Sequence, residues 1–101
     1  MKRLRVRWST SASKDLIEIV EFIGNDKLGR EILNAASRLN RHPKAGTIVP
    51  ELREQGMSDY RQVLVGPYRL IYAVRTNHID IVAALDGRRD LQTALLQRLM
   101  G

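Results

Sequence analysis

The amino-acid sequence predicts an α+β fold with an N-terminal strand, an antiparallel helical hairpin, a three-stranded antiparallel meander and a short C-terminal helix. Apolar residues recur with helical spacing in the first half of the chain, and with the two-residue period of strands over residues 60–86. Helices grouped before a meander indicate a sheet with its helices on one face. The length of 101 residues favours a single domain spanning residues 1–101.

The first strand is predicted over residues 3–8, where arginines alternate with apolar residues and one face is therefore buried. Residues 9–11, Ser-Thr-Ser, supply N-caps for a helix from about Ala12 to Ile23. This helix has an apolar stripe on one side and a polar stripe on the other. The apolar, core-facing stripe is Ala12, Leu16, Ile19, Val20 and Ile23, and the polar stripe is Lys14, Asp15, Glu18 and Glu21.

Gly24 is expected to end the first helix, and Asn25 or Asp26 to cap the second. The second helix is predicted from about Lys27 to Arg41, because Pro43 disfavours helix at the residue before it. The short connection makes the two helices a hairpin. The residues expected to be buried on the second helix are Leu28, Ile32, Ala35, Ala36 and Leu39.

Residues 44–58 have little periodicity and are predicted to form a long surface loop, interpreted as a connection rather than a target-recognition element. Strands follow at 60–65, 68–75 and 78–86, separated by Gly66-Pro67 and by a tight turn at Thr76-Asn77. A terminal helix is predicted from Leu91 to Met100. On the last strand, alternation places Ile79, Ile81, Ala83 and Leu85 on one face.

The charge composition limits the classes of protein that fit. Lys and Arg number 17 against 11 Asp and Glu, giving a net charge of +6, and there is no cysteine. Disulfide scaffolds, cysteine-type zinc sites and thiol catalysis are therefore excluded. The N-terminal residues lack the apolar run of a signal peptide, and no window is apolar enough for a membrane span. We expect a cytoplasmic protein that binds nucleic acid, an acidic protein, or both.

Four segments of the chain resemble one known family. They are the helix start Ala12–Ile19, the His42–Gly46 segment followed by Glu51–Arg53, the strand Tyr68–Tyr72 and the segment Gly87–Leu91. In this order and spacing they resemble the RelE/ParE superfamily of type II toxins over essentially the whole chain. The resemblance implies a small toxin without a cofactor or metal. It also implies a cognate acidic, ParD-like antitoxin that binds the toxin in a hetero-oligomer.

The superfamily has two kinds of activity. RelE-like members cleave mRNA in the ribosomal A site, whereas ParE-like members poison DNA gyrase. In a nuclease of this kind, the catalytic positions would fall on Arg61, Arg69 and Arg89. Val63 stands where a lysine is expected, and Leu95 lies near the expected tyrosine. Because arginine does not titrate near neutral pH, it is a poor general base.

The missing proton-transfer groups favour the ParE-like activity, with stabilisation of the cleaved gyrase–DNA complex. The basic, amphipathic ending at residues 88–101 resembles some ParE-like toxins, although Asp86 stands where a histidine is common there. The alternative is a RelE-like, ribosome-dependent mRNA endoribonuclease. A plain nucleic-acid-binding domain is a third class, but no recognition-helix signature is visible.

Two sets of residues are predicted to bind partners. A basic patch at the sheet edge and the last turn is predicted to bind the target, unless its arginines are simply solvated or structural. Ile17 and Phe22 are predicted to flank the core stripe on opposite sides, by the 100° step of an α-helix. There they either extend the core or bind the antitoxin. The predicted target-binding residues are Arg61, Arg69, Arg88 and Arg89.

Overall fold

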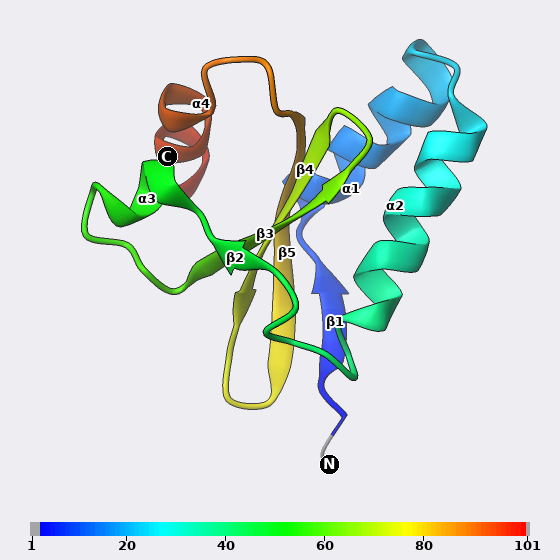
Figure 1. The fold of residues 1–101 in the computed structure, drawn as a ribbon. Coiled ribbons are helices and arrows are strands. Elements are labelled where there is room, and N and C mark those ends of the chain that lie inside the picture. Colours follow the sequence, from blue (N-terminus) through cyan, green and yellow to red (C-terminus); the bar gives the residue numbers. More distant parts are fainter. Residues whose placement is uncertain (1–2, 101) are drawn as a thin grey trace.

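A computed structural model describes residues 3–100; Met1, Lys2 and Gly101 of the predicted domain lie outside it. The predicted α+β fold is confirmed, with a five-stranded sheet at its centre (Figure 1). No helix in this part of the chain is long and apolar enough to cross a membrane. In chain order the elements are β1 (Arg5–Trp8), α1 (Thr10–Ile17), the π-helical turn η1 (Glu18–Phe22), α2 (Asp26–Arg38), β2 (Thr47–Ile48), α3 (Pro50–Arg53), β3 (Tyr60–Val65), β4 (Tyr68–Val74), β5 (His78–Asp86) and α4 (Leu91–Met100).

The strand order in the sheet is β1-β5-β4-β3-β2. The meander β3–β4–β5 is antiparallel as predicted, and residues 75–77 join β4 to β5 in a tight turn, where the Arg75 N–H donates to the His78 carbonyl at 2.8 Å. The N-terminal strand β1 joins as an edge, parallel to β5, with Arg5 opposite His78 and Trp8 opposite Ile81. The other edge is β2, which pairs antiparallel with β3.

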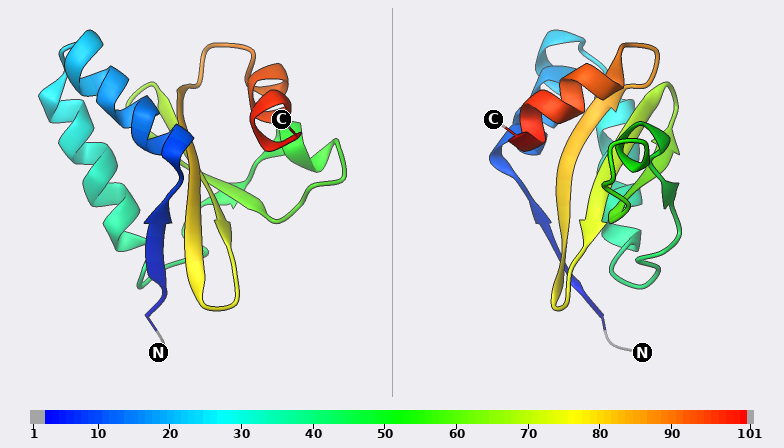
Figure 2. Two further views of the ribbon diagram at one scale, coloured as in Figure 1. Left: turned by 180° about the vertical axis from the view of Figure 1, so that it is seen from behind. Right: turned by 90° about the vertical axis from the view of Figure 1, so that its left-hand side faces the viewer.

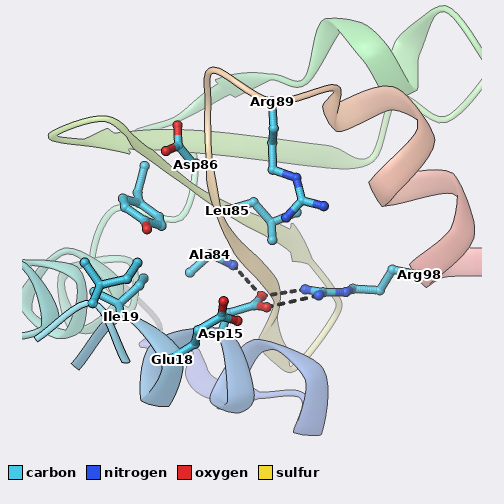
Figure 3. Close-up of a pocket in the computed structure, with 10 residues that line it drawn as sticks. Asp15, Glu18, Ile19, Ala84, Leu85, Asp86, Arg89 and Arg98 are labelled. Atoms are coloured by element: carbon cyan, nitrogen blue, oxygen red, sulfur yellow. Dashed lines mark hydrogen bonds and ion pairs between the residues drawn. The ribbon is translucent and has the colours of Figure 1, made fainter. Parts of the chain in front are cut away.

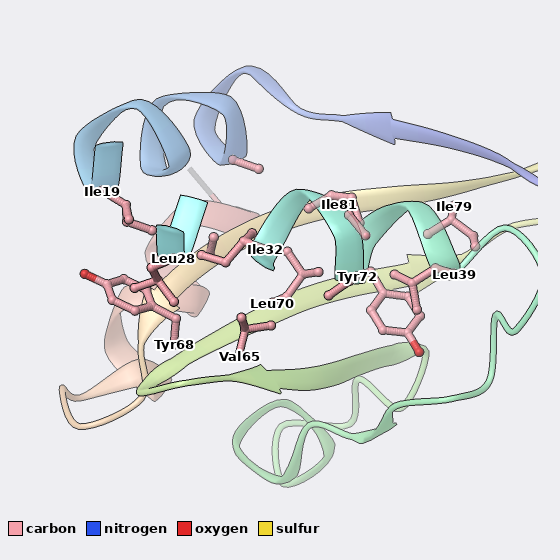
Figure 4. Close-up of a cluster of buried hydrophobic side chains, with 14 residues drawn as sticks. Ile19, Leu28, Ile32, Leu39, Val65, Tyr68, Leu70, Tyr72, Ile79 and Ile81 are labelled. Carbon is pink, nitrogen blue, oxygen red and sulfur yellow. The ribbon is translucent and has the colours of Figure 1, made fainter. Parts of the chain in front are cut away.

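The helical hairpin covers one face of the sheet and buries the larger core (Figure 4). All five residues of the second helix that were expected to be buried are buried. Of the candidate caps, Ser9 and Asn25 cap the two helices, since Ser9 Oγ accepts from the Ala12 N–H and Asn25 Oδ1 from the Leu28 N–H, both at 3.0 Å, and the first helix begins at Thr10, two residues earlier than expected. Gly24 ends the first helix at φ +75°, a conformation that favours glycine. The second helix ends at Arg38, three residues earlier than expected.

The prediction that all helices lie on one face of the sheet is wrong. Helices α3 and α4 lie on the face opposite the hairpin, as Figure 2 shows. There Leu52, Leu91 and Leu95 pack against Ile71 and neighbouring sheet residues in a second cluster. The physical reason is that the sheet presents apolar side chains on both faces, so both faces require cover.

A β-bulge causes part of this second apolar face. Opposite β4, Tyr72 pairs with Ile81 and Ile71 pairs with Ala83, so Val82 is an extra residue in β5. One extra residue moves every following side chain to the other face. The prediction of one continuous face on the last strand is therefore wrong, because Ile79 and Ile81 pack under the hairpin whereas Ala83 and Leu85 join the second cluster.

The first helix also departs from its predicted stripes. Asp15, expected on the polar side, is only 9% exposed, whereas Ile23, expected in the core, is 57% exposed. The helix widens into η1, where the Ile23 N–H donates to the Glu18 carbonyl five residues back. This turn shifts the last residues away from the α-helical register, so Ile23 leaves the core.

The predicted loop over residues 44–58 contains two short elements, β2 and α3, so that prediction is wrong in part. Pro50 begins α3, where its fixed φ suits the first turn of a helix. Val49 and Leu52 are fully buried and anchor the segment on the second core. The segment thus brings the side chains of α3 to the sheet, where Glu51 meets the predicted site.

Candidate functional site

Arg69 lies on β4 on the sheet face covered by α3 and α4. Its Nη1 donates to both carboxylate oxygens of Glu51, at 2.9 and 2.8 Å, and to Oε1 of Gln62 at 3.2 Å. Both side chains of the ion pair are about three-quarters buried. Arg69 is therefore held by a carboxylate on α3 and an amide oxygen on β3, so it is not simply solvated.

Arg69 is also in contact with the turn that carries Arg88 and Arg89. A Cβ added to Gly87 would lie 3.2 Å from Cγ and Nε of Arg69, so the turn packs closely on the arginine stem at this glycine. The Gly87 N–H donates to the Pro67 carbonyl at 2.8 Å and fixes the turn beside the start of β4. Three of the four predicted arginines thus gather at this end of the sheet.

Arg88 and Arg89 differ in their electrostatic surroundings. Arg88 is exposed, and its guanidinium holds the Asp86 carboxylate at 2.6 and 2.9 Å. These hydrogen bonds lower the pKa of Asp86 from 3.8 to about 2. Among residues 3–100, no carboxylate forms an ion pair with Arg89, so its guanidinium remains available to a partner.

Arg61 lies on the opposite face of the sheet from Arg69. It pairs across the strands with Tyr72, whose ring belongs to the core under the hairpin. Its Nη1 donates to the Gly46 carbonyl at 2.7 Å, and the Gly46 N–H donates to the Tyr72 hydroxyl at 2.9 Å. Arg61 therefore anchors the segment before β2, and the four predicted arginines do not form one patch.

A polar pocket lies beside Arg89, between the first helix, the end of β5 and α4 (Figure 3). Its wall contains a partly buried ion pair that sequence reasoning missed: Arg98 of α4 donates to both carboxylate oxygens of the buried Asp15. The Asp15 Oδ2 atom also accepts from the Ala84 N–H at 2.9 Å. Local sequence patterns do not signal this pair, because the partners are 83 residues apart.

Tyr68 lines this pocket, and most of its side chain is buried. Desolvation raises its pKa, and the charges of Asp86 and Glu18 raise it further. The hydroxyl is therefore protonated at neutral pH and does not supply a general base.

Neither histidine belongs to the group of Arg69, Arg88 and Arg89. His78 begins β5, at the end opposite Asp86 and Arg88, and its Nε2 lies 3.0 Å from Asp80. His42 is exposed in the turn after α2. No cluster of His, Asp or Glu in residues 3–100 is arranged to hold a metal ion.

Ile17 and Phe22 are exposed, at 49% and 81%, so they do not extend the core. They line one shallow groove together with Lys14 and Glu18. The prediction that they lie on opposite sides of the helix is wrong, because it used the α-helical step across residues that form the wider π-helical turn.

Comparison with protein families identifies the chain. A model described as "ParE toxin of type II toxin-antitoxin system, parDE" matches residues 6–91. The chain belongs to the ParE toxin family. The resemblance to the RelE/ParE superfamily is thereby confirmed, and the protein is a type II toxin. No curated protein sequence matches this ParE toxin significantly.

Solved structures share the fold of the toxin. A structure entitled "The structure of YoeB dimer from Staphylococcus aureus" is similar with a TM-score of 0.62 and 22% identity, over 81% of this chain and 94% of that chain. "Chromosomal ParDE TA system from P. aeruginosa" is similar with a TM-score of 0.60 and 19% identity, over the same shares of the two chains. At these identities the likeness concerns the fold.

Proposed function

We propose that this toxin inhibits DNA gyrase by stabilising the cleaved gyrase–DNA complex. The observation that carries the proposal is the match of the ParE toxin family over residues 6–91. In this activity the toxin acts by binding and has no catalysis of its own. Arg88 and Arg89, in the exposed turn after β5, are the proposed target contacts, with Arg69 beneath them.

The surroundings of the arginines support a binding role. RNA cleavage requires a general acid or base close to the cationic side chains that stabilise the phosphate. Tyr68 is buried with a raised pKa, and His78 lies at the far end of β5. Helix α4 has neither tyrosine nor histidine.

One observation favours the alternative, a ribosome-dependent mRNA endoribonuclease. Glu51 places a carboxylate on Arg69, and a carboxylate next to an arginine can serve as a general base. Two assays on purified toxin separate the activities. We expect loss of supercoiling by gyrase with accumulation of cleaved plasmid, and no mRNA cuts in a translating extract.

Glu51→Gln makes this comparison sharper. If Glu51 only positions Arg69, glutamine at this position still offers one oxygen that accepts from Arg69. Gyrase inhibition should then change by less than roughly tenfold. As a general base its loss would reduce mRNA cleavage by about 100-fold or more. Glu54→Gln, on the exposed side of the same segment, is the matched control. Cleavage that depends on Glu51 but not on Glu54, with gyrase unaffected, would replace the proposal with the nuclease.

The groove of Ile17 and Phe22 is the proposed antitoxin site. Large exposed apolar side chains are typical of surfaces that bind another protein, and the antitoxin is expected to fold as it binds. Phe22→Ser should therefore weaken capture of the polypeptide encoded beside the toxin gene. Leu64→Ser, which removes an apolar side chain that is 68% exposed on β3, is the control. Equal retention of that polypeptide by both variants and the unaltered toxin would exclude the groove.

A further inference from the structure

The net positive charge of the toxin is concentrated in two segments. Residues 1–14 and 32–50 contain eight of the 17 basic side chains and no Asp or Glu. The nine basic side chains elsewhere are accompanied by all 11 acidic ones. The arginines proposed above for the target lie in this remainder, where Arg69 and Arg88 are already paired with carboxylates.

The fold brings the two segments together. The Leu4 N–H donates to the Asn40 carbonyl at 3.3 Å, so the start of β1 lies against the end of α2. Figure 1 shows this end of the helix beside β1. Because β1 is an edge strand, the end of α2 borders the same margin of the sheet, and the second segment then continues to β2 at the opposite edge. We call this margin the basic pole; its exposed residues are Arg3, Arg5, Arg7, Arg38, Arg41 and Lys44.

The charges of the basic pole are not used within the described molecule. No ion pair in residues 3–100 involves any of its six side chains. Alternate residues of β1 share a face, so Arg5 and Arg7 project about 6.6 Å apart along the strand. Arginines on an edge strand also prevent strand pairing between molecules. That role does not account for Arg38, Arg41 and Lys44, which follow a helix.

The apolar residues near the pole indicate what kind of polyanion it binds. Leu4, Val6 and Trp8 turn inward and pack against the core. None of the large exposed apolar side chains of residues 3–100 belongs to the pole. An acidic peptide that folds on binding needs apolar surface to offset its ordering, whereas a phosphate backbone is bound by charge alone. The observations therefore favour nucleic acid over an acidic protein.

We propose that the basic pole is a second binding surface of the toxin and binds the phosphate backbone of duplex DNA without sequence preference. The inference rests on the proposed function, because the DNA held by gyrase supplies the duplex. The turn at Arg88 and Arg89 would contact the enzyme, and the pole would contact the DNA. Five of the six side chains are arginines, whose guanidinium matches phosphate geometry.

Salt-dependent binding tests the pole directly. Anisotropy of a short labelled duplex is measured with the purified full-length toxin, free of antitoxin, between about 50 and 200 mM salt. Each phosphate contact contributes about 0.9 to the slope of log K against log salt. Arg5→Gln with Arg7→Gln should reduce this slope by about two. Lys27→Gln with Arg30→Gln removes the same charge from exposed positions of α2 outside the pole, and should leave the slope unchanged.

Three outcomes would overturn the inference. An equal reduction of the salt-dependence slope in both double variants would mean that duplex binding depends only on the net charge of the toxin. Binding of polyglutamate, but not of the duplex, that depends on Arg5 and Arg7 would assign the pole to an acidic protein. Absence of duplex binding by the unaltered toxin at the lowest salt would leave the pole without this ligand.

Gyrase assays separate this inference from the function on which it rests. Arg5→Gln with Arg7→Gln should raise the toxin concentration needed to accumulate cleaved plasmid, relative to the Lys27 and Arg30 control. Duplex binding that depends on the pole, together with unaffected gyrase, would refute the proposed function alone. Gyrase inhibition that is identical in both double variants would refute the role of the pole and leave the proposed function standing.

Discussion

Arg98 and Asp15 form the ion pair that fastens the C-terminal helix to the rest of the toxin. Arg98 Nη2 lies 3.0 Å from Oδ1 of Asp15, and Nη1 binds Oδ2. Nη1 also reaches the Val82 carbonyl at 3.3 Å, while Asp15 accepts from the Ala84 N–H. The pair therefore binds the carbonyl of the bulged residue Val82 and the N–H of Ala84 two residues later, where the regular ladder is disrupted. The bulge, α1 and α4 are stabilised together.

Removal of one partner should destabilise the toxin strongly. Arg98→Ala leaves the carboxylate of Asp15 buried without its cation, at a cost of about 3–5 kcal/mol. For a domain of this size, that lowers Tm by more than about 10 °C. Arg30→Ala, an exposed position without an ion pair in residues 3–100, should leave Tm within about 2 °C.

The double variant Asp15→Ala with Arg98→Ala should cost less than the sum of the two single variants, because no unpaired charge is left buried. Thermal denaturation followed by circular dichroism measures all four proteins. Strictly additive losses would show that the two side chains do not stabilise the fold as a pair.

This ion pair also marks what local sequence patterns cannot show. The caps Ser9 and Asn25 and the bounds of β3, β5 and α4 were predicted, because they depend on neighbouring residues. Asp15 was assigned to the solvent side, since periodicity within one helix contains no information on Arg98.

The candidate site was predictable only in part for the same reason. Arg69, Arg88 and Arg89 were identified, but the Glu51 partner depends on the tertiary placement of α3, in a segment interpreted as a loop. Arg61 and Arg69 lie on opposite faces of the sheet because side chains alternate along each strand, and this alternation is visible in the sequence. Arg61 pairs with Tyr72, and Arg69 is three residues before Tyr72 on β4, so its side chain lies on the other face.

Gly29 should be required for packing of the helical hairpin, although alanine has the higher helix propensity. A Cβ at this position would lie 2.5 Å from Val20 Cγ2, and the β-branched valine cannot easily rotate away. Gly29→Ala should therefore lose roughly 1–3 kcal/mol from overpacking against a helix gain of about 1 kcal/mol, so the net change is a loss of up to about 2 kcal/mol. Chemical denaturation measures the change.

The partner substitution provides the control for Gly29. In a Val20→Ala background, the obstructing methyl groups are absent, so Gly29→Ala should be neutral or stabilising. The same loss in both backgrounds would contradict packing against Val20 as the cause.

The Asp86 carboxylate should titrate unusually low because of Arg88. Its pKa is lowered from 3.8 to about 2, chiefly by the side-chain hydrogen bonds from Arg88. A lowered pKa means that the ionised form stabilises the folded turn at pH above about 4, and that this contribution is lost as the pH falls towards 2. NMR titration of the Asp86 carboxyl carbon measures the midpoint.

Arg88→Gln should move that midpoint up towards the ordinary value. Arg53→Gln, on α3 and without an ion pair in the described residues, should not move it. A midpoint near 4 in the unaltered toxin would mean that the ion pair does not persist in solution.

Arg61 should act on stability, whereas Arg88 and Arg89 should act on toxicity. Arg61→Ala removes a partly buried charged hydrogen bond to the Gly46 carbonyl, at a cost of roughly 1.5–3 kcal/mol. Arg88→Ala with Arg89→Ala removes exposed side chains, and a surface ion pair contributes little to stability. We therefore expect the double variant to relieve growth arrest with little change in Tm, because the proposed target contacts are lost from an intact fold. Arg61→Ala should lower Tm by at least about 6 °C.

Growth after induction and Tm of the purified proteins are measured in parallel. A double variant that remains fully toxic would remove Arg88 and Arg89 from the target surface, and one that unfolds would mark the turn as structural.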